Sequence, residues 1–152
     1  MLKLTKKADY ALMAMKHLAE HAHDGALSAK DVAACYGIPP EALAKILQRL
    51  AKAGLLHSLH GINGGYTLAR DARTISAFEV IQAIDGPLFI TSCVTVRGEC
   101  DQTERCTIRE PLRKVNQSIE EVLKRIKISQ MKEEPEVLSA EPRKPAELVT
   151  LT

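Results

Sequence analysis

Residues 28–70, SAKDVAACYGIPPEALAKILQRLAKAGLLHSLHGINGGYTLAR, decide the fold of this chain. Ser28 and Asp31 form a capping pattern that predicts a short helix, and Gly37 marks its end. Pro40 then suits the first position of a second helix. Two short helices joined by a glycine-containing turn are typical of a helix-turn-helix. The residues expected on the buried face of the second helix are Leu43, Ile46, Leu47 and Leu50.

Directly behind the second helix, apolar residues alternate on both sides of the glycine-rich sequence HGINGG, residues 60–65. This pattern predicts a two-stranded hairpin whose turn contains Asn63, Gly64 and Gly65, residues that accept positive φ. A hairpin that directly follows a helix-turn-helix is the wing of a winged helix. The sequence therefore predicts a mainly α fold, a winged helix-turn-helix with a two-stranded wing.

Amphipathic helices are expected on both sides of this unit. Upstream, Thr5 is a candidate N-cap for a first helix. Downstream, Ser76 and Glu79 form a capping box for a helix that ends near Gly86. The apolar stripe of the first helix is expected at Tyr10, Ala14, Leu18 and Ala22.

A long C-terminal helix is predicted from Thr107, where Thr107 and Glu110 repeat the capping pattern and Pro111 lies in the first turn. A helix of about 24 residues would be about 36 Å long, more than a small domain covers. Its apolar residues therefore predict a partner helix, most simply the same helix of a second copy, and a core helix folded back on its own domain is the alternative. The apolar residues that recur at heptad spacing are Ile108, Leu112, Val115, Ile119, Val122 and Ile126.

Three of the four cysteines lie in the segment CVTVRGECDQTERC, residues 93–106. Cys93, Cys100 and Cys106 have the spacing C-x6-C-x5-C, and the lack of a C-x-x-C pair argues against structural zinc. Thiolates are soft ligands that also bind copper(I) and iron-sulfur clusters. A cluster site, redox-active thiols and ordinary cysteines are all compatible with this segment. The fourth cysteine, Cys35, is expected to be a small buried residue of the helix-turn-helix core.

Composition and charge restrict the function classes. The 152 residues are enough for one domain, with or without an appended arm. The chain shows no apolar run of membrane-spanning length and no signal peptide, so we expect a cytoplasmic protein without a membrane partner. Residues 1–75 contain ten Lys and Arg against six Asp and Glu, so an anionic partner would meet this part. No phosphate-binding glycine loop, nucleophile elbow or HExxH pair occurs, which argues against an enzyme and against a small-molecule substrate.

The order of these parts resembles the Rrf-type family of winged-helix transcriptional regulators, over roughly residues 1–131. The most specific parts of the resemblance are the wing sequence GGYTLARD and the three-cysteine segment. The family includes the iron-sulfur sensor IscR, the nitric-oxide sensor NsrR and regulators of Suf cluster assembly. The resemblance implies a homodimer, crossed at the long helix, that binds a double-stranded and roughly palindromic DNA operator, with repression as the family default and activation as the alternative.

The resemblance also implies that the second helix of the helix-turn-helix enters the major groove. By position, Glu41 would accept from a cytosine amine and Lys45 would donate to guanine, while Arg49 and Lys52 suit phosphates. Many relatives have Arg at the wing position of His60, so a weaker, pH-sensitive minor-groove contact is expected here. A solvated helix face is the alternative explanation for each charged residue. The candidate DNA-binding residues are Ser28, Pro40, Glu41, Ala44, Lys45, Gln48, Arg49, His60, Gly61 and Asn63.

By the same resemblance, Cys93, Cys100 and Cys106 would hold an iron-sulfur cluster, either 2Fe-2S or 4Fe-4S. IscR-like members supply a His three residues after the last cysteine, where this chain has Arg109, a cation that cannot be a ligand. Asp9 matches an acidic position that NsrR-like members use as a ligand from the partner subunit, and its alternative role is that of a first-turn acid complementing the helix dipole. Weaker local candidates are Glu99, Asp101 and Glu104.

Four segments are therefore expected: a winged helix-turn-helix domain at 1–86, a cluster-binding cysteine loop at 87–106, a dimerisation helix at 107–131 and a disordered tail at 132–152. The leading hypothesis is a homodimeric DNA-binding regulator, as a repressor, whose cluster senses cluster status, nitric oxide or redox stress. One alternative is a regulator that senses redox state through its cysteines without a cluster. Another is a winged-helix protein-interaction module with no operator.

Overall fold

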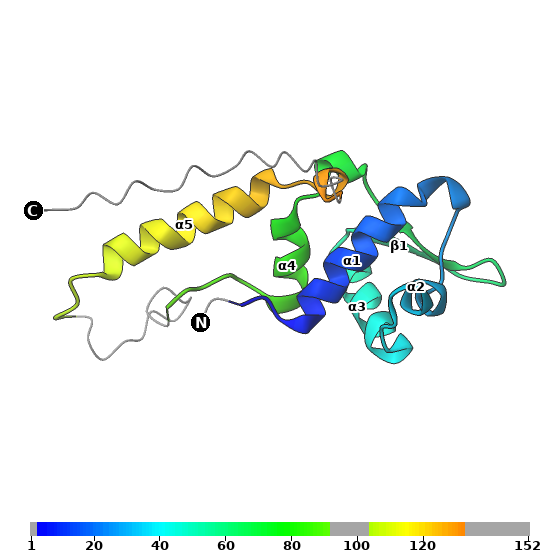
Figure 1. Cartoon of the computed structure of the whole chain (residues 1–152), viewed down its shortest axis with the longest axis horizontal. Helices are drawn as coiled ribbons and strands as arrows, with labels where there is room; N and C mark the ends of the chain where they lie inside the picture. The colour runs from blue at the N-terminus through cyan, green and yellow to red at the C-terminus, as the bar shows by residue number, and fades with distance from the viewer. Residues whose placement is uncertain (1–2, 92–103, 133–152) are drawn as a thin grey trace, which may run out of the picture.

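The structure, a computed structural model, describes residues 3–91 and 104–132. It confirms a mainly helical winged-helix fold, in which α1 to α4 and the hairpin form a head and α5 extends to one side (Figure 1). The described elements are α1 (Lys6–Glu20), η1 (Ala22–Asp24), α2 (Ala29–Tyr36), α3 (Pro40–Lys52), β1 (Leu56–Leu59), β2 (Gly65–Leu68), η2 (Ala72–Thr74), α4 (Ala77–Asp85), α5 (Arg109–Arg125) and η4 (Ile128–Gln130).

Three helices of the head, α1, α2 and α4, begin at the capping residues that the sequence indicates. The Ser28 hydroxyl accepts a hydrogen bond from the Asp31 backbone N–H at 3.1 Å. At α4, Ser76 and Glu79 form the complete capping box. Thr5 caps α1 in the same way. Each cap satisfies a backbone donor that would otherwise have no partner in the first turn, so these helix starts are locally encoded.

The core lies where α1, α3 and α4 meet, with α2 packed on α3. All four residues expected on the buried face of α3 are buried. In α1 the expected stripe is partly wrong: Ala14 and Leu18 are buried, but Tyr10 is half-buried and Ala22 is exposed beyond the helix end. Here the buried face follows the contacts with α3 and α4 and includes Ala8, Ala11, Met15 and His17.

The position of Cys35 also differs from the expectation of a buried core residue. Cys35 is exposed, whereas Val32 and Ala33 are the buried residues of α2. In this short helix the contact with α3 occupies one face, and Cys35 lies on the outer one. Among the residues that the structure describes, no helix is long and apolar enough to span a membrane.

The wing is an antiparallel pair of β1 and β2, as the alternating pattern predicts. Tyr66 on β2 also exchanges backbone hydrogen bonds with Leu27, at 2.8 and 3.2 Å, so the hairpin is attached to the segment that enters α2. Gly65 allows this approach, because a Cβ there would collide with the Leu27 carbonyl. The orientation of the wing is therefore fixed relative to the helix-turn-helix.

The prediction of positive φ in the wing turn is confirmed at Gly65 but wrong at Asn63 and Gly64, and Gly61 has positive φ in addition. Gly61 and Gly65 have φ of 111° and 153°, whereas Asn63 and Gly64 do not have positive φ. Gly64 is instead required for the close approach of the backbone in this turn, because a Cβ there would lie 2.8 Å from the Gly61 carbonyl oxygen. The Gly64 N–H donates to this same oxygen and closes the turn at 3.0 Å.

α5 is shorter than the sequence predicts, with 17 residues and a length of about 26 Å. Its N-cap is Ile108, with no side-chain cap bond, so the expected capping pattern of Thr107 and Glu110 is wrong. The helix begins one residue too late for Thr107 to occupy the N-cap position. The aliphatic side chain of Ile108 has no oxygen with which to accept a bond from the first turn.

At its other end α5 stops because the chain pairs with the head. The Ile126 carbonyl accepts from the Ala77 N–H at 2.8 Å, and the Ile128 N–H donates to the Ile75 carbonyl at 2.9 Å. Ile128 is then buried in the same core as α1 and α4. Ile126 and Ile128, which the sequence places in the last turns of a long dimerisation helix, therefore attach α5 to the head instead.

Candidate DNA interface and cysteine site

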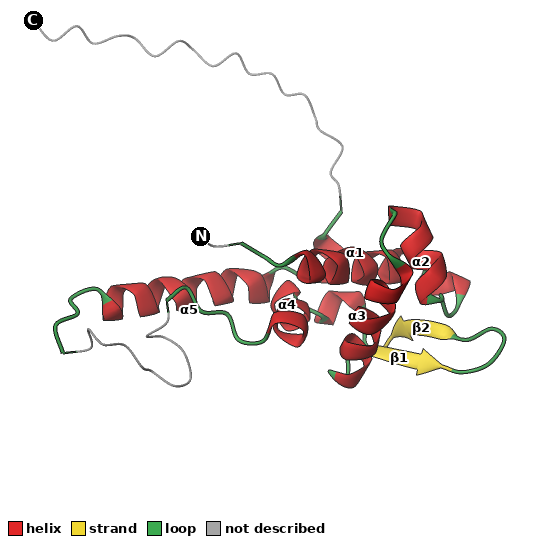
Figure 2. Ribbon diagram, turned by 90° about the horizontal axis from the view of Figure 1, so that it is seen from below, coloured by secondary structure: helices red, strands yellow, loops and turns green. Residues whose placement is uncertain are grey.

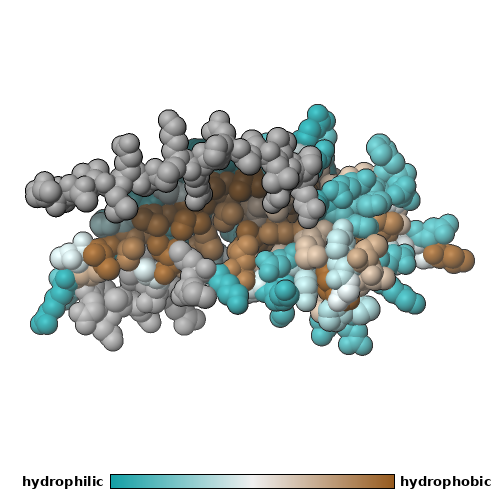
Figure 3. Space-filling model, viewed as in Figure 1, coloured by the Kyte–Doolittle hydropathy of each residue, from teal (hydrophilic) through white to brown (hydrophobic). Residues whose placement is uncertain are grey.

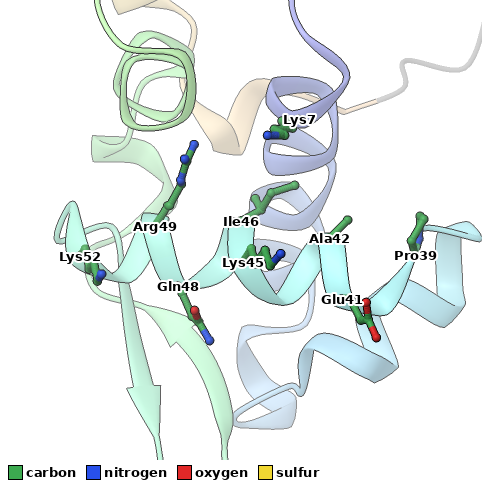
Figure 4. A pocket seen from close by; sticks show the side chains of 9 residues that line it. All are labelled: Lys7, Pro39, Glu41, Ala42, Lys45, Ile46, Gln48, Arg49 and Lys52. Atoms are coloured by element: carbon green, nitrogen blue, oxygen red, sulfur yellow. The ribbon is translucent and has the colours of Figure 1, made fainter.

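The exposed side of α3 forms a basic groove (Figure 4). It lies mostly opposite the buried face of the same helix, although the buried Ile46 also lines it, so the packing that holds α3 also determines which side chains reach solvent. Figure 4 shows these side chains spread along the helix, with Lys7 beside them from the start of α1. Four cations and one carboxylate are suited to a phosphate backbone with limited base contact. The lining residues are Lys7, Pro39, Glu41, Ala42, Lys45, Ile46, Gln48, Arg49 and Lys52.

Sequence reasoning missed Lys7. It is in the first turn of α1, far from α3 in the chain, and only the packing of α1 on α3 brings it to the groove. The sequence TKKADY shows two lysines at a helix start but no sign of this neighbourhood. Lys7 thus adds a cation to the candidate interface.

Arg49 has a second role in the head. Its Nη1 donates to the Ile84 carbonyl at 3.3 Å, in the last turn of α4. Carbonyls at a helix C-terminus carry partial negative charge, which favours a cation there. Arg49 therefore connects α3 to α4 while it also lines the groove.

The wing follows α3 in the chain, its strand β1 contacts α3, and the hairpin projects from the head (Figure 2). His60, Gly61 and Asn63 are exposed in its turn, whereas the hydroxyl of Ser28 is occupied by its cap. Pro40 and Ala44 lie on α3, exposed and half-exposed respectively. Most of the predicted contact residues therefore fall on two adjacent elements.

A histidine and tyrosine cluster joins the end of α1 to α2. His17 Nδ1 lies 2.8 Å from the Tyr36 hydroxyl, and the His17 ring stacks on His21 at 4.1 Å. Burial lowers the pKa of His17 below its ordinary 6.5, and the charge of His21 adds to this, while Glu20 opposes it. Neutral His17 is thus favoured in the folded protein.

The candidate cysteine site is described only at its edge. Cys106 is a half-buried free thiol shortly before α5, and Arg109 is exposed in the first turn. Cys93, Cys100, Glu99 and Asp101 lie outside the described residues. Within residues 3–91 and 104–132, no three His, Cys, Asp or Glu side chains are placed to hold a metal ion.

Asp9 and Cys106 do not meet within one chain. Asp9 is half-buried in the first turn of α1, and Cys106 precedes the free end of α5. Both views place the start of α5 far from the start of α1 along the long axis (Figure 1, Figure 2). A site with both residues as ligands therefore requires two chains.

An open basic helix beside a protruding hairpin defines a winged helix-turn-helix DNA-binding protein. The chain belongs to the Rrf2 family, whose model is described as an iron-dependent transcriptional regulator and matches residues 4–134.

Among known proteins, the chain is 34% identical to the HTH-type transcriptional regulator IscR of Xenorhabdus nematophila, over 93% of this chain and 86% of the relative. The solved structure of T. potens IscR has a TM-score of 0.64 at 32% identity and covers 86% of this chain and 85% of that one. CymR, the global cysteine regulator of B. subtilis, has a TM-score of 0.69 at 28% identity and covers 86% and 95%. These relatives are regulators and not enzymes, and the protein is a DNA-binding transcriptional regulator.

Replacing Lys7 by Ala should weaken binding to all DNA sequences about equally. If Lys7 contacts a phosphate, the slope of log affinity against log salt should become shallower by about 1. Lys114→Ala, on the exposed surface of α5, removes the same charge outside the groove and is the control. Fluorescence anisotropy with duplex DNA at several salt concentrations measures both slopes. Equal slopes for the wild type and Lys7→Ala would remove Lys7 from the interface.

The lowered pKa of His17 predicts that stability is lost on acidification. As pH falls through 6.5, the unfolded chain binds a proton at His17 that the folded protein resists, so the free energy of unfolding decreases. Urea unfolding at several pH values should show a smaller decrease for His17→Gln than for the wild type. His23→Gln, in exposed η1, should behave like the wild type. The same decrease in the free energy of unfolding in all three proteins would show that His17 is not the group responsible for the loss of stability.

Proposed function

We propose that the protein is a homodimeric transcriptional repressor whose operator binding is controlled by an iron-sulfur cluster. The cluster ligands in this proposal are Cys93, Cys100 and Cys106, with Asp9 of the partner subunit as the fourth. The observation that carries the proposal is the exposed apolar row of α5, directly behind Cys106.

The apolar row consists of Ile108, Val115 and Val122, one heptad apart. These side chains are 58%, 46% and 54% exposed, and Ile126 continues the row at 37%. Leu112 and Ile119, the other seam positions, are half-buried. Figure 3 shows the resulting hydrophobic band along α5. Such a contiguous apolar surface is unusual for a monomer and marks an interaction site.

A second copy of α5 suits this row best. The row repeats at heptad spacing, and the same row on a second chain is complementary to it across a two-fold axis. Two heads would then lie on either side of the paired helices, which matches a roughly palindromic DNA site. In such a dimer, the proposed ligand set takes Asp9 from one chain and Cys106 from the other.

The donor set fits a cluster better than a hard cation. Three thiolates are soft ligands that suit iron-sulfur chemistry, while a carboxylate is a weaker and more displaceable fourth ligand. When bound, such a cluster supplies a group that nitric oxide or oxygen destroys. Arg109, at the position where IscR-like members have a ligand, cannot take this role. The chain therefore needs a ligand from elsewhere, and Asp9 meets that need only across the dimer.

A regulator that uses cysteine oxidation without a cluster is the second candidate. Arg109 favours it, because the chain lacks the local fourth ligand of IscR-like members. The two candidates differ in whether iron and sulfide are required for control of DNA binding.

The test of the proposed function is an anaerobic titration of DNA, selected from a random library, with cluster-loaded and cluster-stripped protein. The expected difference in affinity is about tenfold or more, within the usual range of allosteric coupling. Asp9→Ala should reduce this difference, and Asp24→Ala, in exposed η1, should not. Equal affinity of loaded and stripped wild-type protein would contradict cluster control.

Val115→Glu and Val122→Glu should convert the dimer to monomer, because each places a carboxylate in the apolar row against its own copy. Analytical ultracentrifugation measures the mass, and DNA titration should show a loss of affinity at a two-half-site operator. Gln117→Glu adds the same charge on an exposed part of α5 away from the seam and should remain dimeric. Unchanged dimers in both Val variants would exclude the apolar row as the interface.

A further inference from the structure

We propose that Asn116 is a positioning residue that fastens the arm, residues 87–91, to α5, so that the state of the cysteine segment acts on the head through this helix. The arm connects α4 to the cysteines, and Ile90 is three residues before Cys93. This inference rests on the proposed cluster control and adds the residue that transmits it.

Asn116 is unusual within α5. It is 4% exposed and is the one buried residue of Arg109–Arg125, although Val115 beside it is 46% exposed. Burying an amide is unfavourable unless its donors and acceptor are bonded. An aliphatic residue would fill the same space without that requirement, so the amide indicates a need for specific bonds.

Both ends of the Asn116 amide are used. Its Oδ1 accepts from the Ile90 N–H at 3.1 Å, and its Nδ2 donates to Glu120 Oε1 at 3.2 Å. Residues 87–91 adopt neither helix nor strand, so Asn116 supplies a backbone partner that regular structure does not. The arm runs beside α5 in both ribbon views (Figure 1, Figure 2).

The contacts continue from Asn116 toward the head along one face of α5. Glu120 Oε2 lies 3.9 Å from Lys124 Nζ, which in turn lies 4.8 Å from the ring centroid of Phe78 on α4. Spacings of four residues place Asn116, Glu120 and Lys124 in a single row. We call these three residues the polar row.

The polar row ends at the element that supports α3. α4 packs on α3, and Arg49 of α3 donates to the last turn of α4 at Ile84. The partly exposed ion pair between Glu120 and Lys124 contributes little stability, and we assign it a role in orienting the two side chains. A shift of the arm therefore has a continuous set of contacts through which it changes the angle between α5 and the head.

The test uses three variants of the full-length protein. Asn116→Leu keeps the branched shape of the side chain and removes both bonds. Asn116→Asp keeps the bond to Ile90 but sets a carboxylate against Glu120. Asn116→Asp combined with Glu120→Gln keeps the bond to Ile90, restores the bond to residue 120 with the donor and acceptor exchanged, and moves the negative charge from residue 120 to residue 116. Gln117→Leu, at an exposed position of the same helix, is the matched control.

The main readout is the ratio of DNA affinities of loaded and stripped protein, with dimer mass and circular dichroism checked for each variant. We expect the ratio in Asn116→Leu to fall from about tenfold to below about twofold, a loss of coupling. In Asn116→Asp the ratio of the two DNA affinities should fall most of the way to one. In the double variant the ratio should return to within about threefold of the wild-type ratio. Gln117→Leu should match the wild type.

A second readout needs no cluster. Amide hydrogen exchange at Ile90 in stripped protein should be faster in Asn116→Leu and should slow again in the double variant. A wild-type ratio retained in Asn116→Leu, or a double variant no better than Asn116→Asp, would overturn the inference while leaving cluster control intact. A ratio near one in the wild type itself would instead overturn the proposed function, and this inference with it.

Discussion

The return of the chain from α5 into the head determines the rest of the structure. The bonds from Ala77 to Ile126 and from Ile128 to Ile75 form a short antiparallel bridge, and Ile128 is buried beside α1. Because this end of α5 is fixed, its other end and the adjoining Cys106 extend away from the head (Figure 1). One constraint thus leaves the apolar row exposed and places Cys106 away from the basic groove.

α5 divides its functions between two faces. The apolar row is exposed to solvent and suits a second copy, while the polar row contacts the arm and α4. In the proposed dimer, a change at the cysteines would therefore reach both the second copy and the head through the same helix. The basic groove on α3 lies at the end of this connection, where Arg49 meets α4.

The features that the sequence predicts well are those encoded within a few residues. The caps at Ser28 and Ser76, the buried face of α3 and the hairpin all depend on local pattern, and the structure has them. The end of α5 depends on pairing with residues 75–77, some fifty positions away in the chain. The helical spacing of apolar residues does not contain this contact, so it predicted a helix that extends beyond the observed end. The exposure of Cys35 and the place of Lys7 also depend on how helices pack, which spacing along the chain does not contain.

The cluster assignment is tested most directly by anaerobic purification followed by a visible absorption spectrum with iron and sulfide analysis. A cluster held by Cys93, Cys100 and Cys106 predicts a coloured protein with broad visible absorption, containing iron and sulfide, that air or nitric oxide bleaches. The spectrum of Asp9→Ala should differ from that of the wild type if the carboxylate is a ligand. A colourless protein without iron, even after reconstitution with iron and sulfide, would contradict the assignment and leave the three cysteines as redox thiols.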